Sequence, residues 1–97
     1  MLDQAVEMKG IIGQPAVVID KELIRMARAG LGWTAEHLAQ RAGLSIATVR
    51  RAESAQVSPG NLYVLQHTFE AVGVVFLDED QASPNGGRGM RLPRRRP

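Results

Sequence analysis

Apolar residues recur at helical spacing twice within residues 34–53, and the two runs are separated by Gly43 and Leu44. The first run is Leu38, Ala39 and Ala42, and the second run is Val49 and Ala52. A residue that caps helices well precedes each run, Thr34 before the first and Ser45 before the second. Gly43 stands where a helix would end in a left-handed residue. The pattern predicts two short helices joined by a tight turn, with a polar and basic outer face on the second helix.

Another helix is predicted before this pair. Asp20 is a good cap, and the helix that it begins is expected to run to about Ala29. Gly30 and Gly32 are expected to break it. One side of this helix carries Ile24, Ala27, Arg28 and Leu31. Trp33 follows, and we interpret it as a core residue that fills the space between this helix and the next.

A fourth helix is predicted after the turn signal Ser58-Pro59-Gly60, with Asn61 as its cap. Its positions i, i+3, i+7 and i+10 form one apolar stripe of Leu62, Leu65, Phe69 and Val72. Gly73 is expected to end the helix.

The C-terminal part predicts a hairpin. Residues 74–77 are β-branched, aromatic or aliphatic, and residues 89–92 can return as the second strand. A lone two-stranded hairpin is marginal in water, its edges need partners, and Val74 and Phe76 need cover. We therefore expect the hairpin to pair with its copy in a homodimer.

The run IDKELIRMARAGLGW at 19–33, followed by TAEHLAQRAGLSIATVRRAE at 34–53, resembles the Xre-type, lambda-repressor-like helix-turn-helix regulators. The resemblance continues through AVGVVF at 71–76. It implies a mostly α fold, with a four-helix lambda-repressor-like helix-turn-helix domain and a short C-terminal β-hairpin. It also implies a partly buried structural ion pair between Arg28 and Glu53. Ala35 departs from the family pattern, because many members have Gln there in contact with a DNA phosphate.

Charge is distributed unevenly over the regions that these patterns define. We divide the chain into an N-terminal arm at 1–18, a helix-turn-helix DNA-binding domain at 19–73, a dimerisation hairpin at 74–92 and a basic tail at 93–97. Residues 1–83 hold seven Lys or Arg and all ten Asp or Glu, whereas residues 84–97 hold five Arg and no acid. The net charge of +2 therefore combines a body of −3 with a C-terminal stretch of +5, and only local placement of Arg supports DNA binding within the fold.

The composition narrows the class of protein further. There is no Cys, which excludes disulfides and thiolate metal sites. No apolar run approaches the roughly 20 residues of a membrane helix. The first residues lack the basic start and long apolar stretch of a signal peptide. We therefore expect a cytoplasmic protein without a membrane partner.

No catalytic or metal-binding constellation is recognisable. His37 and His67 lie on different predicted helices without a second ligand at i+4. The acidic run Asp78-Glu79-Asp80 lacks the spaced oxygen ligands of a calcium loop. The glycines at 86–89 do not lie between a strand and a helix, as a phosphate loop requires. We expect neither an enzyme nor a cofactor.

The predicted DNA contacts lie at the start of one helix and on the outer face of the next. They are Thr34, Ala35, Glu36, Ser45, Ile46, Ala47, Thr48, Arg50 and Arg51. The backbone amides at 34–36 would hold a phosphate, and a recognition helix of about residues 45–53 would enter the major groove of double-stranded DNA. Arg51 would read guanine, whereas Arg50 would contact phosphate or form an ion pair with a neighbour. Thr48 offers a hydroxyl, and Ala47 a methyl for thymine.

Ile46 leaves a second interpretation open. An exposed Ile needs cover, which either a thymine methyl or a protein partner would provide. The chain would then be a transcriptional regulator that binds its operator as a dimer, or a protein-binding helix-turn-helix module of antiactivator or antitoxin type that uses the same surface.

Overall fold

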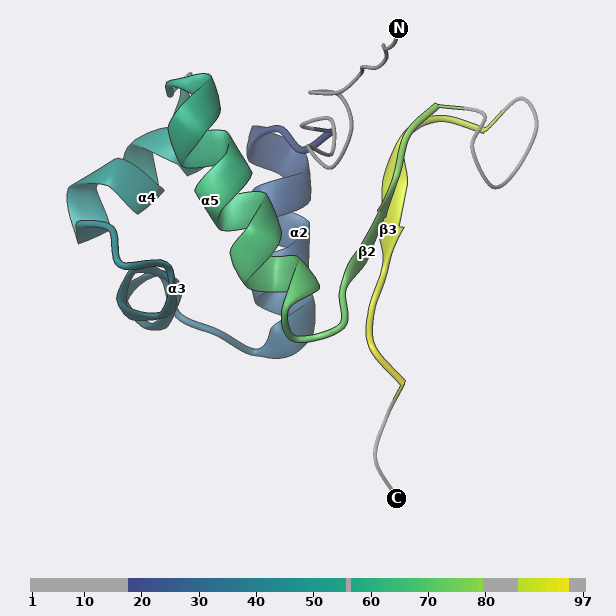
Figure 1. Ribbon diagram of the computed structural model, residues 1–97, viewed down its shortest axis with the longest axis horizontal. Coiled ribbons are helices and arrows are strands. Elements are labelled where there is room, and N and C mark those ends of the chain that lie inside the picture. Colours follow the sequence, from purple (N-terminus) through teal and green to yellow (C-terminus); the bar gives the residue numbers. More distant parts are fainter. Residues whose placement is uncertain (1–17, 56, 80–85, 95–97) are drawn as a thin grey trace, which may run out of the picture.

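The computed structural model describes residues 18–55, 57–79 and 86–94. Within them, the chain is mostly helical, with a small antiparallel hairpin beside the helices (Figure 1). The elements are α2 (Lys21–Leu31), α3 (Ala35–Ala42), α4 (Ile46–Ser54), α5 (Pro59–Glu70), β2 (Val75–Leu77) and β3 (Gly89–Arg91). The expected arm lies outside the described residues except for Val18, as do residues 95–97 of the expected tail. None of the helices within the described ranges is long and apolar enough to cross a membrane.

Side-chain caps begin the first three helices where the sequence predicts them. Asp20, Thr34 and Ser45 each accept a hydrogen bond from the backbone amide three residues further on. Gly43 ends α3 in the left-handed conformation with φ 70°, as predicted. These local signals therefore determine where α3 begins and ends and where α4 begins.

The predicted break at Gly30 is wrong, because α2 continues through Gly30 to Leu31 and ends at Gly32, whose φ is 72°. The role of Gly30 is steric. A Cβ at this position would lie 2.9 Å from the side chain of Leu92, which is closer than real contacts allow. Gly30 thus lets the segment directly after β3 approach α2 closely.

The predicted cap of α5 is also wrong. Ser58 caps the helix by accepting a hydrogen bond from the Asn61 amide at 3.2 Å, and Pro59 occupies the first turn. Proline suits this position because its missing N–H would have had no partner within the helix.

The core lies where the four helices meet. Its fully buried members include Ile24, Leu38, Val49, Leu65 and Phe69. One polar residue, Gln66, is only 2% exposed and was not predicted as part of the core. Its Oε1 accepts a hydrogen bond of 2.8 Å from the amide of Val18, which ties the chain before α2 to α5.

The predicted hairpin is present, and each strand is one residue shorter than expected. Phe76 pairs with Met90, and Val75 pairs with Arg91. Val74 is 2% exposed and Phe76 is 6% exposed, since both pack on the core of their own chain. The expectation that these two residues need cover from a second copy is therefore wrong.

Arg88 lies directly before β3 and connects this strand to the N-terminus of α2. Its guanidinium forms ion pairs with Asp20 and with Glu22, the latter at 3.2 Å. Partial burial acts to raise the pKa of Asp20, but the hydrogen bonds from Arg88 and from the Leu23 amide outweigh it and lower that pKa. The same contact with Asp20 raises the pKa of Arg88. This contact between residues 68 positions apart was not predicted from the sequence.

This arrangement predicts an acid-dependent loss of stability. A carboxyl whose pKa is lowered by folding stabilises the protein above its ordinary pKa of about 3.9, and that stabilisation is lost as the pH falls through the folded-state value. Asp20→Asn keeps a capping side chain but removes the charge. We expect the variant to melt below the wild type at pH 7, and the difference to shrink towards pH 2. Thermal unfolding at both pH values checks this, and a constant difference would contradict it.

Candidate nucleic-acid interface

The helices α3 and α4 are joined by Gly43, Leu44 and Ser45. The amide of Leu44 donates to the carbonyl of Ala39 at 3.0 Å, which closes the end of α3. Ala39 is only 3% exposed, and its small side chain lets other helices pack close to α3. Val49 and Ala52 face the core, so the opposite side of α4 faces outward.

The predicted contact residues are all on the surface side of this unit. Thr34, Glu36, Ser45, Ile46, Ala47, Arg50 and Arg51 are exposed, and Ala35 and Thr48 are half-buried. We refer to these nine residues as the α3–α4 face. Ala35 also packs against the core cluster, which leaves it little side chain to offer a ligand.

Ser45 and Thr48 orient each other at the start of α4. The Ser45 hydroxyl oxygen accepts from the Thr48 amide at 3.0 Å, and the Ser45 hydroxyl donates to Thr48 Oγ1 at 2.9 Å. A hydroxyl rotates and can both donate and accept, so Thr48 can still bond an external group while it contacts Ser45. Thr48 therefore presents a hydroxyl at the start of the outward-facing helix.

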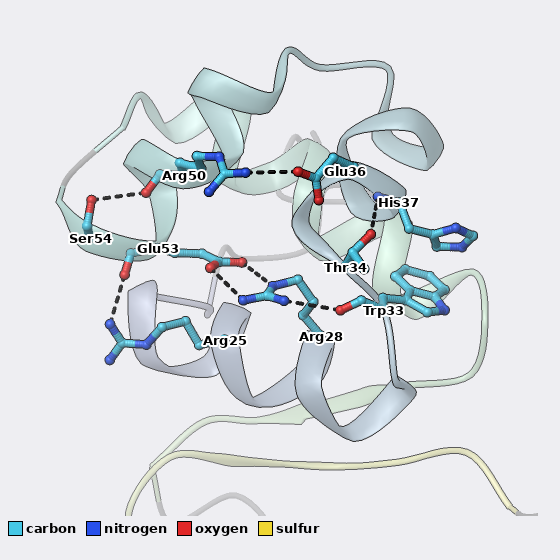
Figure 2. A network of polar contacts seen from close by, with 9 residues as sticks. All are labelled: Arg25, Arg28, Trp33, Thr34, Glu36, His37, Arg50, Glu53 and Ser54. Atoms are coloured by element: carbon cyan, nitrogen blue, oxygen red, sulfur yellow. Dashed lines mark hydrogen bonds and ion pairs between the residues drawn. The ribbon is translucent and has the colours of Figure 1, made fainter.

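The arginines on α3 and α4 differ in the contacts that their side chains make. Arg50 Nη2 lies 2.9 Å from Glu36 Oε2, so the ion-pair alternative for Arg50 is the arrangement present (Figure 2). The Arg41 guanidinium lies 5.0 Å from the ring centroid of Trp33, within cation–π range. The Arg51 side chain makes no hydrogen bond, ion pair or ring contact with any described residue. It is therefore the cation of α4 with its donors available.

The Arg28–Glu53 pair connects α2 to the end of α4. Arg28 Nε donates to Glu53 Oε2 at 2.6 Å, and Nη2 donates to Oε1 at 3.0 Å (Figure 2). The Arg28 Nη1 group also donates to the carbonyl of Trp33 at 3.1 Å. The hydrogen bond to Glu53 raises the pKa of Arg28 against the opposing effect of burial. The pair holds three segments together: α2, the loop between α2 and α3 at Trp33, and α4.

Arg25 completes this support. Its Nη1 donates to the backbone carbonyl of Glu53 at 2.9 Å, which satisfies a carbonyl that the end of α4 leaves without a partner in its own helix. Arg25 was not predicted as part of this support. In the sequence, its spacing of one helical turn from Arg28 was the only indication that the two side chains share a face.

The two histidines make ring contacts. His37 lies 4.9 Å from Trp33, and His67 lies 6.1 Å from Tyr63, measured between ring centroids. Trp33 also stacks on Phe69 at 5.8 Å, so it joins the core as predicted. In the described part of the chain, no group of three or more His, Asp or Glu is placed to hold a metal ion.

Comparisons of the chain with protein-family models, with curated proteins and with solved structures gave no match. The function is therefore argued from the α3–α4 face itself.

Proposed function

We propose that the chain is a sequence-specific DNA-binding transcriptional regulator of the Xre type, with a lambda-repressor-like helix-turn-helix domain. The observation that carries the proposal is the outward face of α4, where the Arg51 side chain has available donors and Thr48 presents a hydroxyl. Arg51 would bind O6 and N7 of guanine in the major groove. Arg28 and Glu53 would fix the position of α4 relative to α2.

Backbone contacts would set the register on the duplex. The amides at the start of α3, beside the Thr34 cap, would hold a phosphate through the positive end of the helix dipole. Ala35 does not prevent this, because the contact uses backbone N–H groups. Ile46 and Ala47 would lie against thymine methyl groups.

A mobility shift with DNA from the upstream region of its own gene tests the proposal. Proteins that contact phosphates release counterions, so the affinity is expected to fall steeply as salt rises from about 50 to 200 mM. Absence of a shifted band at low salt, or a shift that salt does not weaken, would contradict the proposal.

We further propose that the chain acts as a homodimer through the hairpin. The support is not Val74 or Phe76, which are buried, but the exposed apolar side chains of Met26, Val75 and Leu92. Met26 lies one turn before Gly30, which Leu92 contacts, so Met26 and Leu92 share one side of α2. Both edges of the two-stranded sheet also lack a further strand among the described residues.

The dimer predicts a sedimentation result. The wild-type chain is expected to sediment as a dimer at tens of micromolar, and Met26→Glu is expected to shift it toward monomer by placing a charge in the apolar contact. Ile46→Glu, a similar change at a residue 41% exposed on α4, is the control and should leave the dimer intact. A wild-type monomer at these concentrations would contradict the dimer.

A protein-binding module is the second candidate function, and the exposure of Ile46 favours it. Arg50 is paired with Glu36, which lowers the positive charge that the α3–α4 face presents. On this alternative, the partner would bind through an apolar contact with little dependence on salt, and Ile46→Asp would abolish it.

A further inference from the structure

The Glu36–Arg50 ion pair joins the first turn of α3 to the middle of α4. Figure 2 shows the two side chains pointing toward each other between the helices, with Arg50 Nη2 and Glu36 Oε2 separated by 2.9 Å. Both side chains are open to water, with 62% of Arg50 and 55% of Glu36 exposed. The Arg28–Glu53 pair is far more buried, and two hydrogen bonds join its partners. The Glu36–Arg50 pair can therefore open without breaking the two hydrogen bonds between Arg28 and Glu53. The nearby charge of Glu36 also contributes to the raised pKa of Arg28.

Glu36 occupies a position that matters if DNA binds the α3–α4 face. It lies in the first turn of α3, two residues after the Thr34 cap. A phosphate held by the amides of that turn would be close to the Glu36 carboxylate, which repels it. The same carboxylate engages Arg50, a cation of α4 that would otherwise reach toward the DNA backbone. Glu36 thus opposes backbone contact in two ways.

We propose that Glu36 restrains the DNA affinity of this protein by pairing with Arg50, which must leave Glu36 before it can bind a phosphate. This inference rests on the proposed DNA-binding function. Because phosphates carry no sequence information, the restraint acts equally on specific and random duplexes. It lowers the affinity while leaving base discrimination to Arg51. Glu36 thus acts through Arg50, whose guanidinium it holds away from the DNA backbone.

Glu36→Gln tests the inference, because glutamine keeps the size of the side chain and removes its charge. We expect the variant to bind specific and random duplexes roughly three- to tenfold more tightly, since one repulsion is lost and Arg50 is released. The plot of log affinity against log salt should become steeper by about 0.9, the value for one added phosphate contact. Fluorescence anisotropy with a labelled duplex at several salt concentrations measures both quantities. Glu36→Ala serves as a second variant.

Two comparisons separate this role from a general charge effect. Glu79→Gln makes the same charge change two residues after β2, and the β2–β3 hairpin lies on the far side of α2 and α5 from α3 (Figure 1). This variant should change the affinity less than twofold. Adding Arg50→Ala to Glu36→Gln should remove the gain in slope. An affinity of Glu36→Gln within twofold of Glu79→Gln, or a gain in slope that survives Arg50→Ala, would overturn the inference. No salt-dependent binding by the wild type or any of these variants would instead overturn the proposed function, and this inference with it.

Discussion

Glu53→Gln is expected to destabilise the fold by about 2–4 kcal/mol, somewhat less than the 3–5 kcal/mol typical of breaking a fully buried pair. The Glu53 side chain is 11% exposed and that of Arg28 is 26% exposed, so Arg28 keeps part of its hydration when the pair is broken. Glutamine also turns an NH₂ group toward the guanidinium, where donor would meet donor. Thermal unfolding should show a melting temperature lower by roughly 8 °C or more for a domain of this size.

The Glu36–Arg50 pair supplies the matched control for this experiment. It is also a Glu–Arg contact between two helices, but both side chains are more than half exposed. Exposed pairs contribute about 0–1 kcal/mol, so Glu36→Gln should change the melting temperature far less than Glu53→Gln. Equal effects of the two substitutions would show that burial does not determine the contribution of Glu53, and the structural role assigned to it would be wrong.

Arg51→Ala is expected to cost about 1–3 kcal/mol of affinity for the specific site and little for random DNA. The loss is specific because a bidentate contact with guanine discriminates among bases, whereas a phosphate contact does not. The fold should be unaffected, since Arg51 is exposed and its side chain forms no hydrogen bond or ion pair with a described residue. Binding measured on both duplexes at one salt concentration checks the prediction.

Arg50→Ala is the comparison for this result, because it alters the neighbouring residue of the same helix. Its effect on specific and random duplexes should be nearly equal, because neither its pairing with Glu36 nor a contact with phosphate carries sequence information. If Arg51→Ala leaves specific binding unchanged while Ile46→Asp abolishes binding to a protein, the α3–α4 face is a protein-binding surface instead.

Local signals made much of the helical part predictable. A capping oxygen bonds an amide three residues away, and a left-handed glycine acts within its own turn, so Asp20, Thr34, Gly43 and Ser45 could be assigned without tertiary information. The error at Asn61 was also local, because Ser58 followed by Pro59 is itself a signature of a helix start.

The errors at Gly30 and at the hairpin have a different cause. Gly30 lies within α2 and leaves room for the side chain of Leu92, which lies 62 residues further along the chain. The β-branched and aromatic residues at 74–77 correctly predicted a hairpin strand, but not which side the core would cover, and so Val74 and Phe76 were expected at a dimer contact. The approach of Leu92 to Gly30 and the side of the hairpin that faces the core both depend on packing between distant segments. Periodicity within one segment carries no information on that packing.

The candidate site shows the same division. Which residues face outward on α4 followed from helical spacing, and the structure places them on the surface. The partners of the charged residues did not follow from spacing: Glu36 meets Arg50 across two helices, and Arg88 meets Asp20 across most of the chain. Composition therefore could not predict which surface arginines are paired with an acidic side chain and which are available to bind DNA.

Selection of binding sites from a pool of random-sequence duplexes tests the central claim most directly. The account predicts that the wild-type chain enriches a two-fold related motif with a guanine in each half, and that Arg51→Ala loses the preference for that guanine. If the wild-type chain enriches no motif, or if Arg51→Ala enriches the same motif with the same guanine, the claim that α4 reads DNA bases is contradicted.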